Sequence, residues 1–209
     1  MLMKKIVIAM TLAGLLGAAN TRAGQGADSE PLVWCGLDYS MVKMIGSEEF
    51  RAPDKIFPGM LEAWNALFMK ELLPRLEKMD PSLVTDLKAV EDRNAKASAK
   101  QIEREDGTRA EKVDPTHITE ADIAKAVSSY KLTKDKGLGL VFIVDRLVKA
   151  QQIGCLYVVY FDVSSRKVVH SERMCNEAGG MGFRNYWFKP IKLAAEKLPK
   201  TYKSVKAGK

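Results

Sequence analysis

The chain has few of the residues that catalytic and metal sites need. Among its 209 residues there are two histidines, His117 and His170, and three cysteines. Neither histidine has the helical two-histidine spacing of a zinc site or lies near a cysteine pair. There is no Gly-x-Ser-x-Gly elbow, and no serine or cysteine has an identifiable histidine partner. We therefore expect no metal, no cofactor and no catalytic residue that a motif identifies.

Long apolar runs are also scarce. One run, residues 6–19, follows two lysines and is about 14 residues long, shorter than the roughly 20 that a spanning helix needs. Thr21 and Ala23 then place small residues at −3 and −1 of a cleavage point. Residues 1–23 are therefore predicted to be a secretory signal peptide, with an uncleaved anchor as the alternative. We expect an exported protein, periplasmic or secreted, with no transmembrane helix after cleavage.

Negative charge is scarce at the carboxyl end. The formal net charge of the chain is +7, but three cations leave with the signal. Residues 189–209 hold seven lysines and one glutamate, so the rest of the mature chain is slightly acidic. The basic character belongs to the carboxyl end, and binding to nucleic acid is not predicted.

Residues 199–209 are predicted to be a basic flexible tail. Clustered lysines contribute to binding at anionic lipid surfaces. We therefore expect a weak, salt-sensitive contact with an anionic surface, and a solvated, frayed terminus is the alternative. The lysines concerned are Lys197, Lys200, Lys203, Lys206 and Lys209.

What the sequence does contain is hydrophobic periodicity. Residues 24–31 form a polar linker, and alternation from Val33 to Met41 predicts a strand that can extend to Ile45. Residues 83–90 fit a helix or a strand, and we favour a strand. Residues 91–118 are polar and predict an exposed excursion. A helical stripe between these segments predicts an amphipathic helix, kinked or ended by Pro74. Its members are Phe57, Leu61, Trp64, Phe68, Leu72 and Leu76.

The carboxyl half gives the clearest pattern. Strands are predicted over 138–148, 153–163 and 167–175, and an acidic N-cap pattern at Thr119 predicts a helix before them. A last helix follows, with Pro190 inside its apolar stripe. The fold class is therefore α/β: a single mixed sheet of about five strands with a carboxyl-terminal antiparallel three-strand meander, covered by three helices. We place one domain at 32–198.

Three segments carry a resemblance. They read GLGLVFIV (137–144), YVVYFD (157–162) and GGMGFRNYW (179–187). The chain resembles an uncharacterised family of exported bacterial proteins over about residues 30–198. Its topology is also similar to the amino-terminal domain of the Tol translocation protein and the periplasmic region of the curli secretion pore. The family implies no activity, and the topological likeness implies none either.

The glycine loop of residues 179–182 is the first candidate site. Gly179, Gly180 and Gly182 lie between a strand and a helix, a context in which backbone amides can bind phosphate. No Lys-Ser/Thr follows, however, and Asn185 stands where a dinucleotide fingerprint needs its last glycine. The pattern favours a tight connection. Arg184 is the residue we would assign to an anion if one binds.

Asp145 is the second candidate, a lone charge in a buried strand. Burial can raise the pKa of a catalytic carboxyl group, but such a residue more often pairs with an arginine, here Arg146 or Arg173. We therefore expect a non-catalytic envelope binding or assembly module for an unknown component. The alternative is a hydrolase that acts on an anionic envelope substrate through the glycine loop and Asp145.

The cysteines make a third pattern. Export places them where disulfides persist. If Val163 lies opposite Lys167, then Cys155 lies opposite Cys175 and a disulfide can form. If the hairpin register is one residue shorter, the two side chains point to opposite faces and the bond is excluded. Three buried free thiols are the alternative, and Cys35 stays unpaired in either case.

Overall fold

The structure is a computed structural model that describes residues 30–46, 48, 50–103 and 116–208. The predicted signal peptide, most of the linker and Lys209 lie outside the described residues. The strands are β1 (Leu32–Asp38), β2 (Lys43–Ile45), β3 (Val84–Thr85), β4 (Ile102–Glu103), β5 (Leu138–Val148), β6 (Ile153–Asp162) and β7 (Val168–Glu177). The helical segments are α1 (Pro53–Lys55), η1 (Ile56–Met60), α2 (Leu61–Glu71), α3 (Leu73–Met79), α4 (Lys88–Asn94), η2 (Ala99–Gln101), α5 (Glu120–Ser128) and α6 (Gly182–Lys206).

β5 is the centre of the sheet. On one side it pairs in parallel with β1 and, further along, with β2. β3 and β4 extend that side in parallel. On the other side β6 pairs antiparallel with β5, and β7 pairs antiparallel with β6. The predicted mixed α/β class is confirmed, but the described residues form a sheet of seven strands rather than about five. The two additional strands are β2, which the first predicted strand contained, and β4, which is too short to show a period in the sequence.

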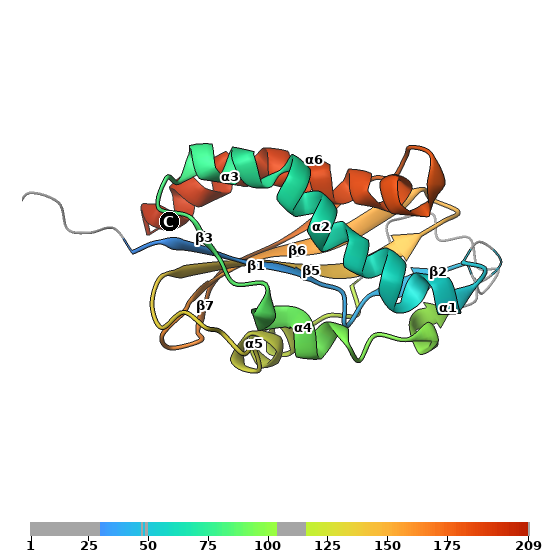
Figure 1. The fold of residues 1–209 in the computed structure, drawn as a ribbon, viewed down its shortest axis with the longest axis horizontal. Coiled ribbons are helices and arrows are strands. Elements are labelled where there is room, and N and C mark those ends of the chain that lie inside the picture. Colours follow the sequence, from blue (N-terminus) through green and yellow to red (C-terminus); the bar gives the residue numbers. More distant parts are fainter. Residues whose placement is uncertain (1–29, 47, 49, 104–115, 209) are drawn as a thin grey trace, which may run out of the picture.

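Helices cover both faces of the sheet (Figure 1). α2, α3 and α6 cover one face, where the larger core includes Trp34, Phe68 and Phe142. α4 and α5 cover the other face over a smaller core with Cys35 and Val127. The expectation of three covering helices is therefore wrong, because the predicted first helix is divided and α4 was not predicted as a helix.

The predicted helical stripe is confirmed by burial. All six side chains are at most 9% exposed. They face the sheet from η1, α2 and α3. The helix divides at Leu72, and Pro74 occupies the first turn of α3, where its missing N–H is not needed.

Two predicted segments need correction. Residues 83–90 form only a two-residue strand, β3, after which α4 begins. The excursion over 91–118 is not simply exposed, because Asn94 is buried and β4 joins the sheet beside β2. These segments lack a long apolar run, and polar contacts hold them instead. Residues 104–115 lie outside the described residues.

α6 runs unbroken past Pro190 and through Lys206. Tyr202 and Val205 are buried, and the Tyr202 hydroxyl donates a hydrogen bond to the buried Asp80 carboxylate. Residues 199–206 are therefore the docked end of a helix. The prediction of a flexible tail from residue 199 is wrong because it took the apolar stripe to end at Leu198.

Candidate functional site

The cluster around Asp145 is the most concentrated polar arrangement that the structure builds near the middle of the sheet. The register between β5 and β6 shifts between Val144 and Arg146, so Asp145 is the extra residue of a β-bulge. Asp145 continues the alternation of Val141 and Ile143, which face the α4–α5 side of the sheet, and the bulge changes the facing of the residues after it, so that Leu147 lies in the larger core. The side chain of Asp145 is fully buried.

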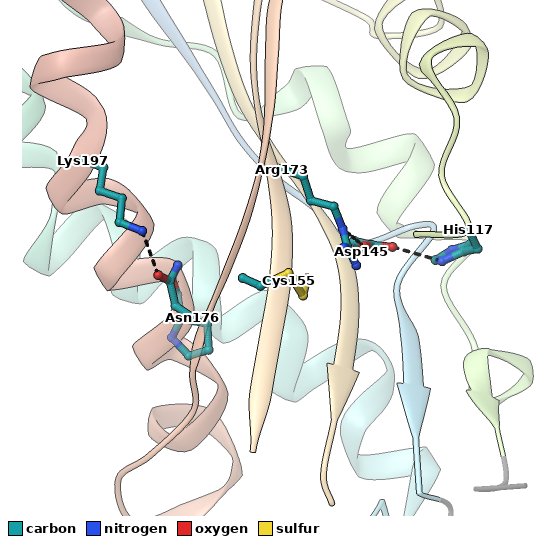
Figure 2. The surroundings of a disulfide bond; sticks show 8 residues. His117, Asp145, Cys155, Arg173, Asn176 and Lys197 are labelled. Carbon is teal, nitrogen blue, oxygen red and sulfur yellow. Dashed lines mark hydrogen bonds and ion pairs between the residues drawn. A yellow bond between two sulfur atoms is a disulfide. The ribbon is translucent and has the colours of Figure 1, made fainter. Parts of the chain in front are cut away.

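Two side chains hold this carboxylate. Arg173 Nε on β7 donates a hydrogen bond to Asp145 Oδ2 at 2.7 Å. His117 Nδ1 lies 3.1 Å from Asp145 Oδ1, and its Nε2 lies 2.8 Å from the backbone oxygen of Met41. Figure 2 shows Asp145 between Arg173 and His117. Of the two arginines considered from the sequence, Arg173 is the one that pairs with Asp145.

The geometry assigns His117 a structural role. Its two ring nitrogens face oxygens of the protein, those of Asp145 and of the Met41 backbone. A general base needs a lone pair that faces a substrate, which this arrangement does not offer. His117 therefore bridges β5 and the backbone at Met41.

The electrostatics of Asp145 agree with this reading. Burial alone would raise the pKa of the Asp145 carboxyl group, but His117 and Arg173 outweigh burial and hold that pKa below its usual range. A general acid at neutral pH needs the opposite shift. Asp145 is thus a carboxylate at neutral pH and pairs with its neighbours.

The chain next to this cluster departs from the sheet between β1 and β2. Around Asp38–Val42 its backbone groups bind side chains rather than a neighbouring strand. Asn94 Oδ1 accepts from the Tyr39 N–H at 2.9 Å, and Gln101 Nε2 donates to the oxygens of Tyr39 and Ser40 at 3.2 and 2.9 Å. Buried backbone groups need such partners. The long first strand expected from the sequence is therefore two strands, joined by a segment held by side chains.

A second buried carboxylate, Asp38, ends β1. It accepts from Arg93 Nε at 2.8 Å, from the Tyr130 hydroxyl at 2.9 Å and from the Ser40 N–H at 2.9 Å. Burial and the nearby Asp38 charge raise the pKa of Tyr130, so the phenol is a neutral donor. Asp38 ties α4 and α5 to the sheet, as Asp145 ties β7 to His117.

The glycine loop makes hydrogen bonds within the protein. Because Pro190 has no N–H, it cannot bond the carbonyl of Tyr186 within α6. The N–H of Gly179 donates to that carbonyl at 3.0 Å instead. Gly180 and Gly182 have φ of 118° and 75°, which makes glycine the favoured residue at both. The loop thus acts as a tight connection.

Arg184 does not join Asp145. Arg184 lies in the first turn of α6, exposed, and its Nε donates to the neighbouring Asn185. Its backbone oxygen accepts from Trp64 on α2. Figure 2 shows α6 on one side of the strands and the Asp145 cluster on the other. The candidate residues of the glycine loop and Asp145 are therefore separated by the sheet.

The structure joins Cys155 and Cys175 in a disulfide. Next to the turn, the N–H of Asp162 donates to the Lys167 oxygen. This pairing belongs to the shorter register, which by itself would exclude the disulfide. A register shift between Tyr160 and Phe161 then changes the pairing. Beyond it, the register is the one that places the cysteines opposite each other. Both registers considered from the sequence occur, one on each side of a bulge.

A groove of about 840 Å³ lies between α5 and β7. Lys125, Arg166 and Lys167 line it together with one carboxylate, Glu120. Val169 also lines the groove. The register shift between β6 and β7 leaves Val169 without a partner on β6, and it is 53% exposed. The groove is therefore a mixed basic and apolar surface.

Several of these residues were missed from the sequence. Asp38, Arg93 and Asn94 were not singled out, and His117 was considered only as a metal ligand. One signal was available: an acid at the carboxyl end of a buried strand, as at Asp38, needs partners. Nothing in the sequence identifies Arg93 or His117 as those partners, because both come from polar segments without periodicity.

The described part of the chain contains no cluster of three metal-ligating side chains, and no helix in it is long and apolar enough to cross a membrane. Comparisons with protein-family models, characterised proteins and solved structures find no match to this chain. The resemblance to exported bacterial proteins thus stays an expectation from the sequence.

Proposed function

We propose that this chain is an exported, non-catalytic binding or assembly module of the cell envelope. The signal pattern of residues 1–23 supports export, and the periplasm or the exterior is the expected compartment. The bound component is an envelope molecule rather than a small substrate. The basic and apolar groove beside β7 supports contact with a partner.

One observation carries the non-catalytic part of this proposal. Arg173 Nε donates to Asp145 Oδ2, His117 Nδ1 lies 3.1 Å from Asp145 Oδ1, and His117 Nε2 lies 2.8 Å from the Met41 oxygen. A catalytic dyad would present a lone pair or a proton to a substrate. Here the carboxylate and the imidazole face other groups of the protein instead.

The alternative, a hydrolase that acts on an anionic envelope substrate, has less support. It requires Asp145, Arg184 and the amides of Gly179, Gly180 and Gly182 to surround one substrate. Trp187 of α6, the helix that the loop enters, packs in the core on one face of the sheet, and Ile118 next to His117 packs in the core on the other face. The Gly179 amide is already bonded. The loop is therefore better explained as the entry to α6.

The carboxyl-terminal half supports an assembly role by analogy. We propose that β5, β6 and β7, closed by α6, form the unit expected from the sequence, an antiparallel meander with a covering helix. That unit is similar in topology to the Tol and curli periplasmic domains. The analogy concerns the fold, and it suggests assembly without identifying a partner.

The export part is tested by expressing the full chain in a Gram-negative host and separating its compartments. We expect mature protein outside the cytoplasm with Gly24 as its first residue, as determined by amino-terminal sequencing. A chain that keeps its first residues in the cytoplasm contradicts export.

The non-catalytic part is tested with the purified mature protein and a panel of ester, phosphoester, glycoside and peptide substrates. We expect no turnover, and we expect Asp145→Asn to lower the melting temperature. Turnover by the wild type that Asp145→Asn abolishes without a change in melting temperature would overturn the proposal. Lys134→Ala, an exposed charge change elsewhere, is the matched control.

A further inference from the structure

The outer side of α6 carries an excess of positive charge. The helix has 25 residues, seven of them cationic and one, Glu196, anionic. At 1.5 Å per residue it is about 37 Å long. α6 lies with α2 and α3 in the helical layer on one face of the sheet (Figure 1).

Carboxylates pair with both lysines in the first part of this helix. Lys189 and Lys192 pair with acids of β7 and α2, and Glu196 pairs with a cation of α3. The three pairs are Lys189–Glu177 at 2.6 Å, Lys192–Glu71 at 3.8 Å and Arg75–Glu196 at 3.2 Å. These contacts bind α6 to its neighbours, and Arg184 in the first turn is the cation of this part that has no ion pair among the described residues.

The second part is different. Its four lysines are exposed, and among the described residues no carboxylate lies within 4.0 Å of their amines. Among the described residues, Lys197 donates a hydrogen bond to the Asn176 side-chain oxygen at 3.2 Å (Figure 2). We call these four residues the lysine face: Lys197, Lys200, Lys203 and Lys206.

The negative end of the helix dipole explains the position of only some lysines of the lysine face. Cations in the last turn of a helix are stabilising, which accounts for Lys203 and Lys206. Lys197 and Lys200 lie further from the end and have no carboxylate partner. Two carboxylates contact this half of α6, Glu172 through Thr201 and the buried Asp80 through Tyr202. The surface nevertheless keeps a positive excess.

We propose that the lysine face binds an anionic lipid bilayer by electrostatic attraction. The four lysines recur every three residues and so extend over about half of the helix circumference. Cations on a formed helix can bind a charged surface without the ordering of the chain that a disordered tail would need. Each lysine near such a surface raises the partition constant roughly five-fold. The proposal rests on the proposed function only in that export places the protein beside a membrane.

The test measures binding of the mature protein to vesicles of phosphatidylglycerol and phosphatidylcholine by co-sedimentation at low ionic strength. The variant is Lys200→Ala/Lys203→Ala, which leaves every described ion pair of α6 intact. We expect its partition constant to fall at least ten-fold. Binding of the wild type should also disappear at about 1 M salt, where the Debye length is about 3 Å.

The matched control is Lys134→Ala/Lys136→Ala, which removes the same charge from exposed positions between α5 and β5. We expect this variant to bind like the wild type, and melting curves check that both variants fold. A truncation after Leu198 is not suitable because it removes the buried Tyr202 and Val205.

Four outcomes would overturn the proposal. They are no vesicle binding by the wild type, equal loss in both double variants, equal binding to pure phosphatidylcholine, and binding to a soluble polyanion without binding to vesicles. Each concerns purified protein and lipid, so a failure here leaves the proposals on export and catalysis unchanged.

Discussion

The Cα atoms of Cys155 and Cys175 lie 4.1 Å apart at directly opposite positions of β6 and β7. So short a separation is typical of a non-hydrogen-bonded pair in an antiparallel ladder. The link closes a hairpin, with a sequence separation of 20 residues. In the folded protein, β6 and β7 are paired with or without the disulfide. The disulfide therefore acts mainly by restricting the unfolded chain.

We expect Cys155→Ala/Cys175→Ala to lower the free energy of unfolding by about 3 kcal/mol, because the linked unfolded chain has less entropy. Urea unfolding of both proteins, with and without reductant, measures this difference. The reductant should destabilise the wild type and leave the double variant unchanged. Thiol counting on denatured, unreduced protein should find one thiol, Cys35, and three would contradict the disulfide.

Asp145→Asn tests the buried pairing. Removing the carboxylate charge leaves the Arg173 guanidinium without its counter-charge, and we expect a loss of about 3 kcal/mol in the free energy of unfolding. Chemical unfolding at neutral pH measures it. Asp135→Asn, an exposed carboxyl group, is the control and should change stability little.

The same pair gives a pH dependence with a definite sign. The folded pKa of Asp145 lies below its unfolded value, which is about 3.9. Its contribution is therefore complete above that unfolded value and is lost as the pH falls through the folded pKa. We expect wild type and Asp145→Asn to differ most at neutral pH and to converge in acid. A difference that grows as the pH falls would refute the assignment.

Tyr202→Phe tests the docking of the end of α6. The substitution removes the hydroxyl that donates to buried Asp80 and leaves that carboxylate with fewer donors. We expect a loss of about 2 kcal/mol, the range for a hydrogen bond to a charged group. Thermal and urea unfolding measure it, with exposed Lys203→Ala as the control. No loss would mean that the last turns of α6 contribute little to the fold.

Gly139→Ala tests the packing between β5 and β6. A Cβ atom at Gly139 would lie 2.3 Å from the ring of Phe161, so the ring or the strands must move. We expect a loss of about 3 kcal/mol, at the upper end for overpacking. Gly59→Ala, where nothing lies within 4 Å of the added carbon, is the matched control. Equal unfolding free energies for the two variants would contradict this packing.

The sequence predicted the elements in which periodicity is continuous. The stripe from Phe57 to Leu76 and the run from Leu138 to Val148 each bury enough apolar surface to show their period. The last helix also appears in the pattern, but its end does not. Tyr202 and Val205 continue the apolar stripe, but they lie among lysines. Lysines near the end of a chain suggest a solvated tail unless the helix is known to continue.

The bulges and the side-chain clamps could not be predicted in the same way. A bulge adds one residue to a strand without changing its composition, so no local signal identifies Asp145 or Val169 as the extra residue. The partners of Asp145 are 28 positions away in each direction, at Arg173 and His117. Such long-range pairing depends on the assembled sheet. Residue types alone therefore suggested an arginine partner without deciding between Arg146 and Arg173.

β3 pairs with only part of β1. Beyond β3, two amide side chains bond the backbone of a single residue of β1, Leu37. Asn65 of α2 accepts from the Leu37 N–H at 2.8 Å, and Asn94 of α4 donates to the Leu37 oxygen at 2.9 Å. α2 and α4 cover opposite faces of the sheet, so neither layer can detach without breaking a bond to Leu37. Local opening of one layer is thereby coupled to the other, and the Leu37 amide should exchange its hydrogen only in the global unfolding reaction.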